Sequence, residues 1–244
     1  MSRIKFLNIE VDNLTMDEAI ERINDLIVNQ KPSYVVTPNV DHIVKLENDT
    51  DFQKVYENAD LILTDGMPLI WISKIKRNPI KEKISGSDLF PKICGLAAKK
   101  GYKVFLLGAA EGVAAKAAEN LKEKYSDLNV VGTYSPSYGF ENNEKEIEKI
   151  ISEINNVKPD ILAVGLGAPK QEKFIYNFRD KLNVPVSLAI GASIDFEARN
   201  IKRAPKWMQR IGFEWFYRLC KEPKRMFKRY IIDDMKILKL IFNY

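Results

Sequence analysis

The sequence predicts an α/β fold with an open, mostly parallel β-sheet and a basic, amphipathic helical appendage at its C-terminal end. Apolar runs rich in β-branched residues alternate along the chain with stretches of helical periodicity. Several of these runs are apolar throughout, as expected for strands buried on both faces of a parallel sheet. After Arg203 the alternation stops, and basic and aromatic residues become interleaved. We therefore expect an α/β domain over residues 1–200 and a helical appendage over residues 201–244.

The predicted elements follow one another in the order of a Rossmann-like domain. The first helix begins with a capping box, Thr15-Met16-Asp17-Glu18, and extends to about Asn29. Because helical stretches separate the strands, we expect the strands to run parallel. The six predicted strands are residues 34–37, 61–65, 103–108, 130–134, 161–167 and 186–191. The further predicted helices are residues 40–58, 68–76, 88–100, 112–125, 143–156 and 169–182.

The basic charge of the protein is concentrated in the appendage. Residues 201–230 contain ten lysines and arginines against two acidic residues, a net charge of +8, so the rest of the chain carries −3. A helix is predicted from Pro205 to Glu222, where Pro223 interrupts it. Basic helices with aromatic side chains bind membrane interfaces, so we expect this region to contact an anionic membrane surface.

A second helical pattern follows in the last residues of the chain. Its apolar stripe consists of Phe227, Ile231, Met235, Leu238 and Phe242. For residues 231–244 this stripe leaves three partners open: lipid, the α/β domain, or another subunit in a homo-oligomer.

Length and composition restrict the class of protein. With 244 residues, 45% of them hydrophobic and 29% charged, the chain is typical of a globular protein and not of a disordered or fibrous one. It has no secretion signal and no run of about eighteen apolar residues, so we expect neither export nor a membrane span. Cys94 and Cys220 lie far apart and in no metal-ligand pattern, which suits a reducing cytoplasm. His42, the single histidine, is expected to be a surface or packing residue.

Small and polar residues follow the predicted strands. The carboxyl ends of parallel strands form the ligand-binding edge of such a sheet. Glycines there let a ligand approach the backbone, and Thr, Asn and Gln side chains supply directed hydrogen bonds, so a nucleotide-shaped ligand is the expected occupant. The residues at this edge that we expect to bind substrate are Thr37, Asn39, Gly108, Gly165, Gly167, Lys170 and Gln171.

Asp65 ends an apolar strand and precedes Gly66, so its carboxylate is expected to project into the ligand crevice. A partly desolvated carboxylate in that place can act as a general base toward an attacking hydroxyl. Alternatively, Asp65 caps the helix that follows it. The residues alone leave both interpretations open.

Two other patterns favour simpler explanations. Gly165-Leu166-Gly167 lacks the third glycine of a dinucleotide fingerprint, because Lys170 stands in its place, so a nicotinamide site is not expected. Asp49-Thr50-Asp51 has the spacing of a divalent-cation site in sugar-nucleotide transferases, but helix capping explains it better. We expect no metal and no cofactor.

The chain carries a further set of motifs. They are Thr37-Pro38-Asn39, Thr64-Asp65-Gly66, Ser85-Gly86-Ser87-Asp88-Leu89, Gly165-x-Gly167-x-Pro169-Lys170-Gln171-Glu172, Gly191-Ala192-x-x-Asp195-Phe196, Arg203-Ala204-Pro205-x-Trp207 and Glu214-Trp215-x-x-Arg218-Leu219-x-x-Glu222-Pro223-x-Arg225. These motifs resemble the WecG/TagA/CpsF glycosyltransferase family over nearly the whole chain, and most closely its N-acetylmannosaminyltransferases of wall teichoic acid synthesis.

The resemblance implies an activity, its partners and a location. The activity is metal-independent transfer of N-acetylmannosamine from UDP, with inversion, to the 4-hydroxyl of N-acetylglucosamine on undecaprenyl diphosphate. The expected partners are thus a UDP-sugar donor, a lipid-linked acceptor and the anionic inner face of a bacterial plasma membrane, on which the protein would be peripheral.

The resemblance also implies roles for single residues. Asp65 corresponds to the general base, and Thr37, Asn39 and Gln171 correspond to polar residues that line the pocket. Lys83 stands where relatives usually carry arginine, so it would contact the diphosphate with its charge but without the two-pronged guanidinium. The appendage would supply the cations that stabilise the leaving group, namely Arg218, Arg225 and either Lys228 or Arg229.

Other functions remain as alternatives. A sister transferase that uses UDP-N-acetylmannosaminuronic acid or UDP-glucose fits the same residues, because the sequence does not identify the sugar. A basic nucleic-acid-binding protein or a membrane-associated scaffold would explain the appendage. A nucleic-acid-binding protein does not account for the polar groups at the strand ends, so no nucleic-acid partner is expected. Release of UDP in the presence of a lipid-linked acceptor would exclude a scaffold.

Overall fold

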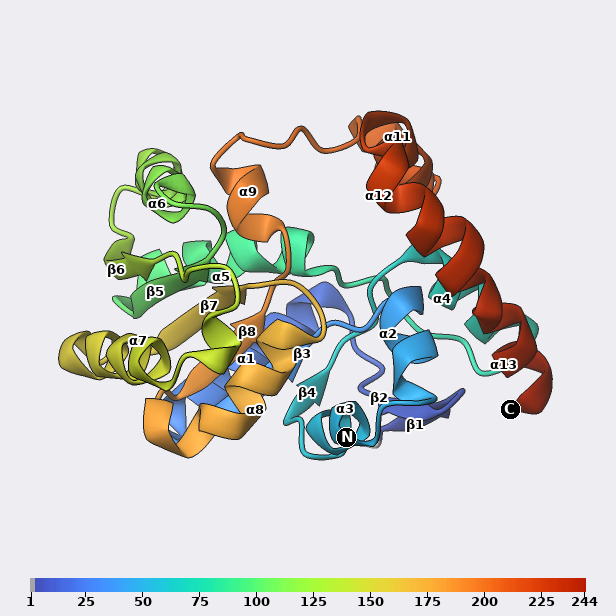
Figure 1. The fold of residues 1–244 in the computed structure, drawn as a ribbon, viewed down its shortest axis with the longest axis horizontal. Helices are drawn as coiled ribbons and strands as arrows, with labels where there is room; N and C mark the ends of the chain where they lie inside the picture. Colours follow the sequence, from blue (N-terminus) through green and yellow to red (C-terminus); the bar gives the residue numbers. More distant parts are fainter. Residues whose placement is uncertain (1–2) are drawn as a thin grey trace.

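A six-stranded, fully parallel sheet forms the centre of the molecule (Figure 1). The computed structural model describes residues 3–244, apart from the side chains of residues 210, 225, 231 and 232. The strand order is β4-β3-β8-β7-β5-β6, which confirms the predicted fold class. The strands are β3 (Ser33–Val36), β4 (Leu61–Ile62), β5 (Lys103–Gly108), β6 (Asn129–Tyr134), β7 (Ile161–Gly165) and β8 (Val186–Ala189).

Both faces of the sheet are buried, which explains the continuously apolar strands. On one face Tyr34 and Val36 belong to a core cluster with α2 (Val40–Leu46), α3 (Thr50–Glu57), α4 (Met67–Ile75), α7 (Glu144–Val157) and α8 (Lys170–Leu182). On the other face Val35 packs with α1 (Met16–Val28), α5 (Gly86–Lys100), α6 (Val113–Lys124) and α9 (Ser193–Glu197). Successive residues of a strand thus serve opposite layers.

Helix capping explains why the predicted start of the first helix is confirmed and why another predicted helix is divided in two. Thr15 and Glu18 form the predicted capping box at the start of α1. The single helix predicted over residues 40–58 is two helices, because Asp49 caps α3 by accepting a hydrogen bond from the Phe52 amide at 2.9 Å. Asp49 also pairs with Lys173 at 2.7 Å, so the Asp-x-Asp pattern is a cap. Nowhere in the described part of the chain do three or more His, Cys, Asp or Glu residues gather as a metal site.

Several short elements were not predicted. β1 (Ile4–Phe6) and β2 (Ile9–Val11) form an antiparallel hairpin, and η1 (Phe140–Asn142) is a single 3₁₀ turn. Elements of this length carry too little periodicity to be recognised in a sequence. The Asp12 carboxylate joins the hairpin to β4 by accepting from the Ile62 amide at 2.8 Å. It also pairs with Arg3 at 3.3 Å, which links the two ends of the hairpin.

The appendage is more broken than predicted. The helix expected from residue 205 to 222 is divided into α10 (Lys206–Arg210) and α11 (Glu214–Lys221), because Gly212 has a φ of +81°. α12 (Pro223–Phe227) then begins with the predicted proline. It continues through the π-helical η2 (Lys228–Asp233) and the 3₁₀ turn η3 (Asp234–Lys236) into α13 (Ile237–Asn243).

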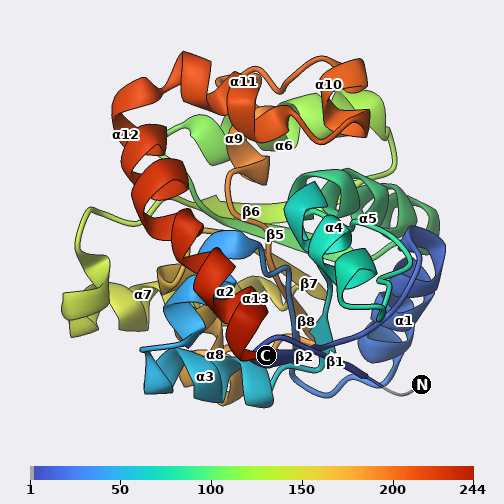
Figure 2. The same cartoon turned by 90° about the vertical axis from the view of Figure 1, so that its right-hand side faces the viewer.

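The end of the appendage packs on the α/β core (Figure 2). Ile237 and Leu240 are buried in the core cluster that contains α2, and Lys76 donates to the Ile241 carbonyl at 2.8 Å. The predicted apolar stripe does not make this contact, since Phe227, Met235, Leu238 and Phe242 are exposed; the Ile231 side chain lies outside the description. The last helix of the appendage therefore packs on the core through one face, while the apolar stripe is exposed on another face of the appendage. No helix within the described range has the length and apolar character needed to span a bilayer.

Candidate active site

A polar cavity of about 600 Å³ lies at the carboxyl ends of β3, β4, β7 and β8. α/β proteins bind ligands at the carboxyl ends of the strands, at the point where the strand order of the sheet reverses. The appendage contributes cations to its wall. The predicted site residues that line it are Thr37, Asn39, Asp65, Gly165, Gly167, Gln171, Arg218, Lys228 and Arg229.

A second cavity, of about 400 Å³, lies between α4 and the appendage. Most of its exposed wall is apolar and includes Met67, Pro68, Trp71, Trp215 and Met235. Its charged lining residues are Asp65, Lys83, Glu214, Arg218, Arg229 and Asp234. The two cavities share five lining residues, namely Asn39, Asp65, Ser87, Arg218 and Arg229. The carboxylate of Asp65 is therefore at the boundary between a polar and an apolar cavity.

The loop after β4 holds Asp65 in this position. The Asp65 amide donates to the Pro38 carbonyl at 2.8 Å, which ties the ends of β4 and β3 together. Gly66, at a φ of +100°, is the N-cap residue of α4, and no side chain caps that helix. The alternative role of Asp65 as a helix cap is therefore wrong.

The charges around Asp65 act in both directions on its pKa. Burial raises the pKa of Asp65 above its ordinary value and is the largest effect. The Lys83 ammonium and the Arg218 guanidinium oppose the shift, whereas the carboxylates of Glu214 and Asp88 add to it. A carboxylate with a raised pKa is a stronger base, as proton abstraction from a hydroxyl requires.

Asn39 and Gln171 belong to one buried hydrogen-bond network. His42 contacts the Asn39 side-chain oxygen through Nδ1 at 2.8 Å and the Glu172 carboxylate through Nε2 at 3.2 Å. Gln171 donates to the same Glu172 oxygen at 2.7 Å and accepts from the Gly191 amide at 3.0 Å. The network joins the ends of β3, β7 and β8, so it fixes the polar floor of the first cavity. His42 is buried, so it is not a surface residue, and it also lines the polar cavity.

The glycines after the strands have different surroundings. Gly165 lines the polar cavity, and a Cβ there would lie 2.7 Å from the Gly191 carbonyl oxygen. Gly167 also lines it and has open space around it. Gly108, which we expected to bind substrate, is not in either cavity wall: it packs against the Gly165 backbone at a φ of +126°. Its small size serves strand packing.

Of the two lysines of the predicted site, Lys83 lines a cavity and Lys170 does not. Lys83 is half-buried, lines the apolar cavity and pairs with Asp88 at 2.8 Å. Lys170 is exposed and lines neither cavity; it forms an ion pair with Glu141 and lies over the Tyr138 ring. The structure therefore does not bring Lys170 to the other site residues.

The appendage cations approach the site from above the strand ends. Arg218 lines both cavities and lies 5.1 Å from the centre of the Phe196 ring. Arg229 donates to the Asn39 side-chain oxygen at 3.3 Å, and Lys228 lines only the polar cavity. The Arg225 side chain lies outside the description.

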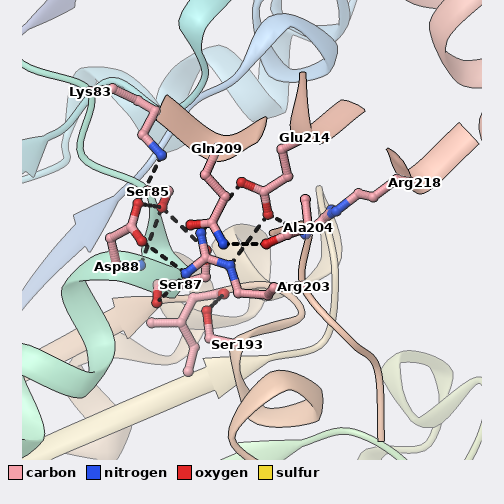
Figure 3. Close-up of polar contacts among 11 residues, drawn as sticks. Lys83, Ser85, Ser87, Asp88, Ser193, Arg203, Ala204, Gln209, Glu214 and Arg218 are labelled. Carbon is pink, nitrogen blue, oxygen red and sulfur yellow. Dashed lines mark hydrogen bonds and ion pairs between the residues drawn. The ribbon is translucent and has the colours of Figure 1, made fainter. Parts of the chain in front are cut away.

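A group of charged residues near Asp65 was not identified as functional from the sequence. Arg203 of the appendage pairs with Asp88 of the core at 2.8 Å and with Glu214 within the appendage at 3.4 Å (Figure 3). All three belong to the motifs quoted above, but nothing in a linear sequence indicates that residues so far apart in the chain are in contact.

Comparison with known proteins identifies the family. The model of the glycosyl transferase WecG/TagA/CpsF family matches residues 4–244. The chain belongs to this family. Two members are N-acetylglucosaminyldiphosphoundecaprenol N-acetyl-beta-D-mannosaminyltransferases from Bacillus. That of Bacillus subtilis (strain 168) is 32% identical over 219 residues, 89% of this chain and 83% of the relative. That of Bacillus spizizenii is 33% identical over 195 residues, 80% of this chain and 74% of the relative.

A third WecG/TagA/CpsF member is more distant but covers more of the chain. The protein of the same name from Staphylococcus aureus (strain MW2) is 27% identical over 227 residues, 92% of this chain and 87% of the relative. The similarity to the family therefore includes both the α/β core and the appendage.

Proposed function

We propose that this protein is an inverting glycosyltransferase that moves N-acetylmannosamine from UDP-N-acetylmannosamine to the 4-hydroxyl of N-acetylglucosaminyl-diphospho-undecaprenol. The names of its relatives support the reaction. The structural observation that carries the proposal is the place of Asp65, at the boundary between a polar and an apolar cavity. A transferase that joins a nucleotide sugar to a lipid-linked sugar needs a base between two such sites.

The donor binds in the polar cavity. Backbone groups of Gly165, Gly167 and Gly191 are accessible there, and the side chains of Asn39 and Gln171 supply hydrogen bonds to a sugar or a uracil. Arg218, Lys228 and Arg229 line the same space and provide positive charge for the diphosphate. Charge that develops on the departing UDP is stabilised by these side chains.

The acceptor binds in the apolar cavity. Trp71, Met67 and Met235 offer an apolar wall to the first units of a polyprenyl chain, while Lys83 and Arg218 offer charge to its diphosphate. In this arrangement the 4-hydroxyl of the acceptor sugar faces Asp65. The carboxylate takes the hydroxyl proton as the oxygen attacks the anomeric carbon, and the bond to the UDP oxygen breaks on the opposite side.

We further propose that the protein acts as a peripheral protein on the cytoplasmic face of the membrane. Trp207, Phe213, Phe216 and Phe227 are exposed large apolar side chains, and they share the appendage with most of the excess positive charge. Aromatic side chains insert at the headgroup level, and each nearby lysine or arginine adds about 1 kcal/mol on anionic lipid. Docking would bring the apolar cavity to the lipid-linked acceptor.

The experiment that tests the reaction is mass-spectrometric detection of a hexosamine added to a short-chain GlcNAc-diphosphate-lipid analogue. UDP-N-acetylmannosamine is compared with UDP-N-acetylglucosamine, UDP-N-acetylmannosaminuronic acid and UDP-glucose. We expect transfer from the first donor and little from the others. Preferred transfer from a different donor would assign the protein to a sister reaction, and no transfer from any donor would refute the proposal.

The role of Asp65 is tested in the same assay. We expect Asp65→Asn to lower kcat by about 100-fold or more, because the amide cannot accept the proton, while UDP binding stays within a few-fold of that of the unmodified protein. An unchanged kcat would remove Asp65 from the role of base.

A further inference from the structure

Five residues of alternating charge connect the core to the appendage beside the proposed site (Figure 3). On the core, Lys83 pairs with Asp88 at 2.8 Å, and the Ser85 hydroxyl donates to the same Asp88 oxygen at 2.6 Å. Arg203 pairs with the other Asp88 oxygen at 2.8 Å. The series continues into α11 through Glu214 and ends at Arg218.

Within this series, the guanidinium of Arg203 pairs with two carboxylates, those of Asp88 and Glu214. Its Nη1 donates to Asp88 and to the Ser87 carbonyl, whereas its Nε and Nη2 face the two Glu214 oxygens, each at 3.4 Å. About 21% of its side chain is exposed, so its ion pairs are shielded from water. A planar guanidinium can serve two carboxylates at once in this way, and a lysine cannot.

Arg203 and Arg218 also share one aromatic ring. The guanidinium of Arg203 lies 5.6 Å from the centre of the Phe196 ring, and that of Arg218 lies 5.1 Å from it. Glu214 and Arg218 are one helical turn apart on α11, with 3.9 Å between their charged groups. Glu214 therefore offsets the repulsion between two cations that both lie near the Phe196 ring.

The end of this series lies at the proposed base. Arg218 lines both cavities with Asp65, and its charge acts directly on that carboxylate. The contact between Arg218 and Glu214 is long, and α11 has no buried side chain of its own. Packing of α11 alone thus gives little restraint, and the ion pairs of Arg203 supply a connection between this helix and the core.

We propose that Arg203 is a positioning residue for the transfer reaction: anchored on Asp88, it holds Glu214, and through Glu214 it holds Arg218 beside Asp65. This inference rests on the proposed function, because it assigns Arg218 a task in the transfer. Arg203 itself lines neither cavity and touches no substrate in this arrangement. Its effect on the reaction passes through Arg218.

A double-mutant cycle on kcat tests this dependence. We expect Arg203→Met to lower kcat with UDP-N-acetylmannosamine and the short-chain acceptor analogue by about tenfold or more, with a change of less than about threefold in the KM for the donor. In the Arg218→Met background the same substitution should lower kcat by less than about threefold, because the Arg218 guanidinium that Arg203 positions is no longer present. Independent, multiplicative losses would overturn the proposal, as would an unchanged kcat for Arg203→Met.

Two further variants separate positioning from folding. Glu214→Gln keeps the shape of the link and removes its charge, so it should lower kcat in the same Arg218-dependent manner. Arg3→Met is the matched control, since Arg3 is also half-buried and ion-paired, with Asp12 at 3.3 Å, near the β1-β2 hairpin at the other end of the molecule (Figure 2). Arg3→Met should lower the melting temperature and leave kcat unchanged. Equal kcat losses in Arg3→Met and Arg203→Met would contradict the proposal.

Hydrogen exchange gives a readout that does not depend on the identity of the substrate. In Arg203→Met the amides of α11 should exchange faster than in the unmodified protein, and in Arg3→Met they should not. If the unmodified protein transfers no sugar, the proposed function fails, and this measurement still tests the anchoring of α11. Unchanged exchange in Arg203→Met would refute the anchoring whatever the reaction proves to be.

Discussion

The chemistry of Asp65 depends on a balance of nearby charges more than on the residue itself. Burial favours its protonated form, and the carboxylates of Asp88 and Glu214 act in the same direction. Lys83 and Arg218 favour the ionised form. Asp88 and Glu214 are themselves paired with cations, Lys83 and Arg203. The negative charges near Asp65 are therefore largely compensated. Such an arrangement tunes a base without neutralising it.

This balance predicts a pH effect of Lys83. A nearby cation lowers the pKa of Asp65, so its removal in Lys83→Met raises that pKa further, and a larger fraction of the base is protonated at a given acidic pH. We expect the acid limb of the kcat/KM profile to move to higher pH in Lys83→Met. Lys83→Arg, which keeps the charge, should leave the limb in place. An acid limb that does not move would show that Lys83 exerts no such control over the base.

β5 and β7 lie close together where they end, beside the candidate site. β5 and β7 are neighbours along five residue pairs, and the last of these is Gly108 with Gly165. A side chain at Gly108 would overlap the Gly165 carbonyl, and the backbone there has a φ of +126°. Gly108 therefore acts on the site through the packing of two strands.

This packing predicts a large stability cost for Gly108→Ala. We expect a loss of about 3 kcal/mol or more in the free energy of unfolding, from backbone strain and from overlap with β7. Gly112→Ala is the matched control: Gly112 also has a positive φ, of +76°, but open space around it, so only about 1 kcal/mol should be lost. Urea denaturation of both variants measures the difference, and equal losses would exclude overlap as the cause.

The turn at η3 contains Asp234, a partly buried carboxyl group with a raised pKa. Burial, as the largest effect, raises the pKa of Asp234 to about 6, although Arg229 opposes the shift; Asp41 adds to it. One Asp234 oxygen is buried without a hydrogen-bond partner among the described groups. Ionisation of Asp234 therefore weakens the packing of the appendage at neutral pH.

The pKa predicts how stability varies with pH. Between the ordinary value of 3.8 and about 6, the folded protein binds the proton more tightly than the unfolded chain does, so this group's contribution to stability decreases as the pH rises through that window. Asp234→Asn removes the charge and should raise the free energy of unfolding by about 1–2 kcal/mol at pH 7.5. The gain should vanish near pH 4, and urea denaturation at both values checks it. An equal gain at both pH values would contradict this explanation.

We expect the appendage and the α/β core to form one functional unit, although the core has the larger share of the described buried residues. Among the side chains that the structure describes, the buried apolar ones belong to residues before position 201, apart from Ala204, Met226, Ile237 and Leu240. The proposed base, Asp65, and the polar network are on the core, whereas Arg218, Lys228 and Arg229 come from the appendage. The core is thus expected to fold by itself but to lack the cations needed for transfer.

Removal of residues 201–244 tests this division. We expect the truncated protein to retain its circular dichroism spectrum and a cooperative melt, at a lower temperature, because few core contacts are lost. It should have no detectable transfer activity and should no longer sediment with vesicles that contain anionic lipid, whereas the full chain sediments with them at low salt. Full activity in the truncated protein would refute the role of the appendage.

The sequence by itself determined the α/β class, the six strands, most helices and the strand ends at which the site lies. These features depend on local periodicity and capping, which a few consecutive residues encode. It also indicated Asp65, because a carboxylate after an apolar strand has a defined place in a parallel sheet.

Only the tertiary structure decided the strand order, the outward direction of Lys170, the packing role of Gly108 and the apolar cavity between α4 and the appendage. The ion pair of Asp88 with Arg203 joins residues 115 positions apart. The periodicity of apolar residues indicates which face of a helix or strand is buried. It does not indicate which other element covers that face, or which charged side chains that element places there. Those contacts depend on how the whole chain packs.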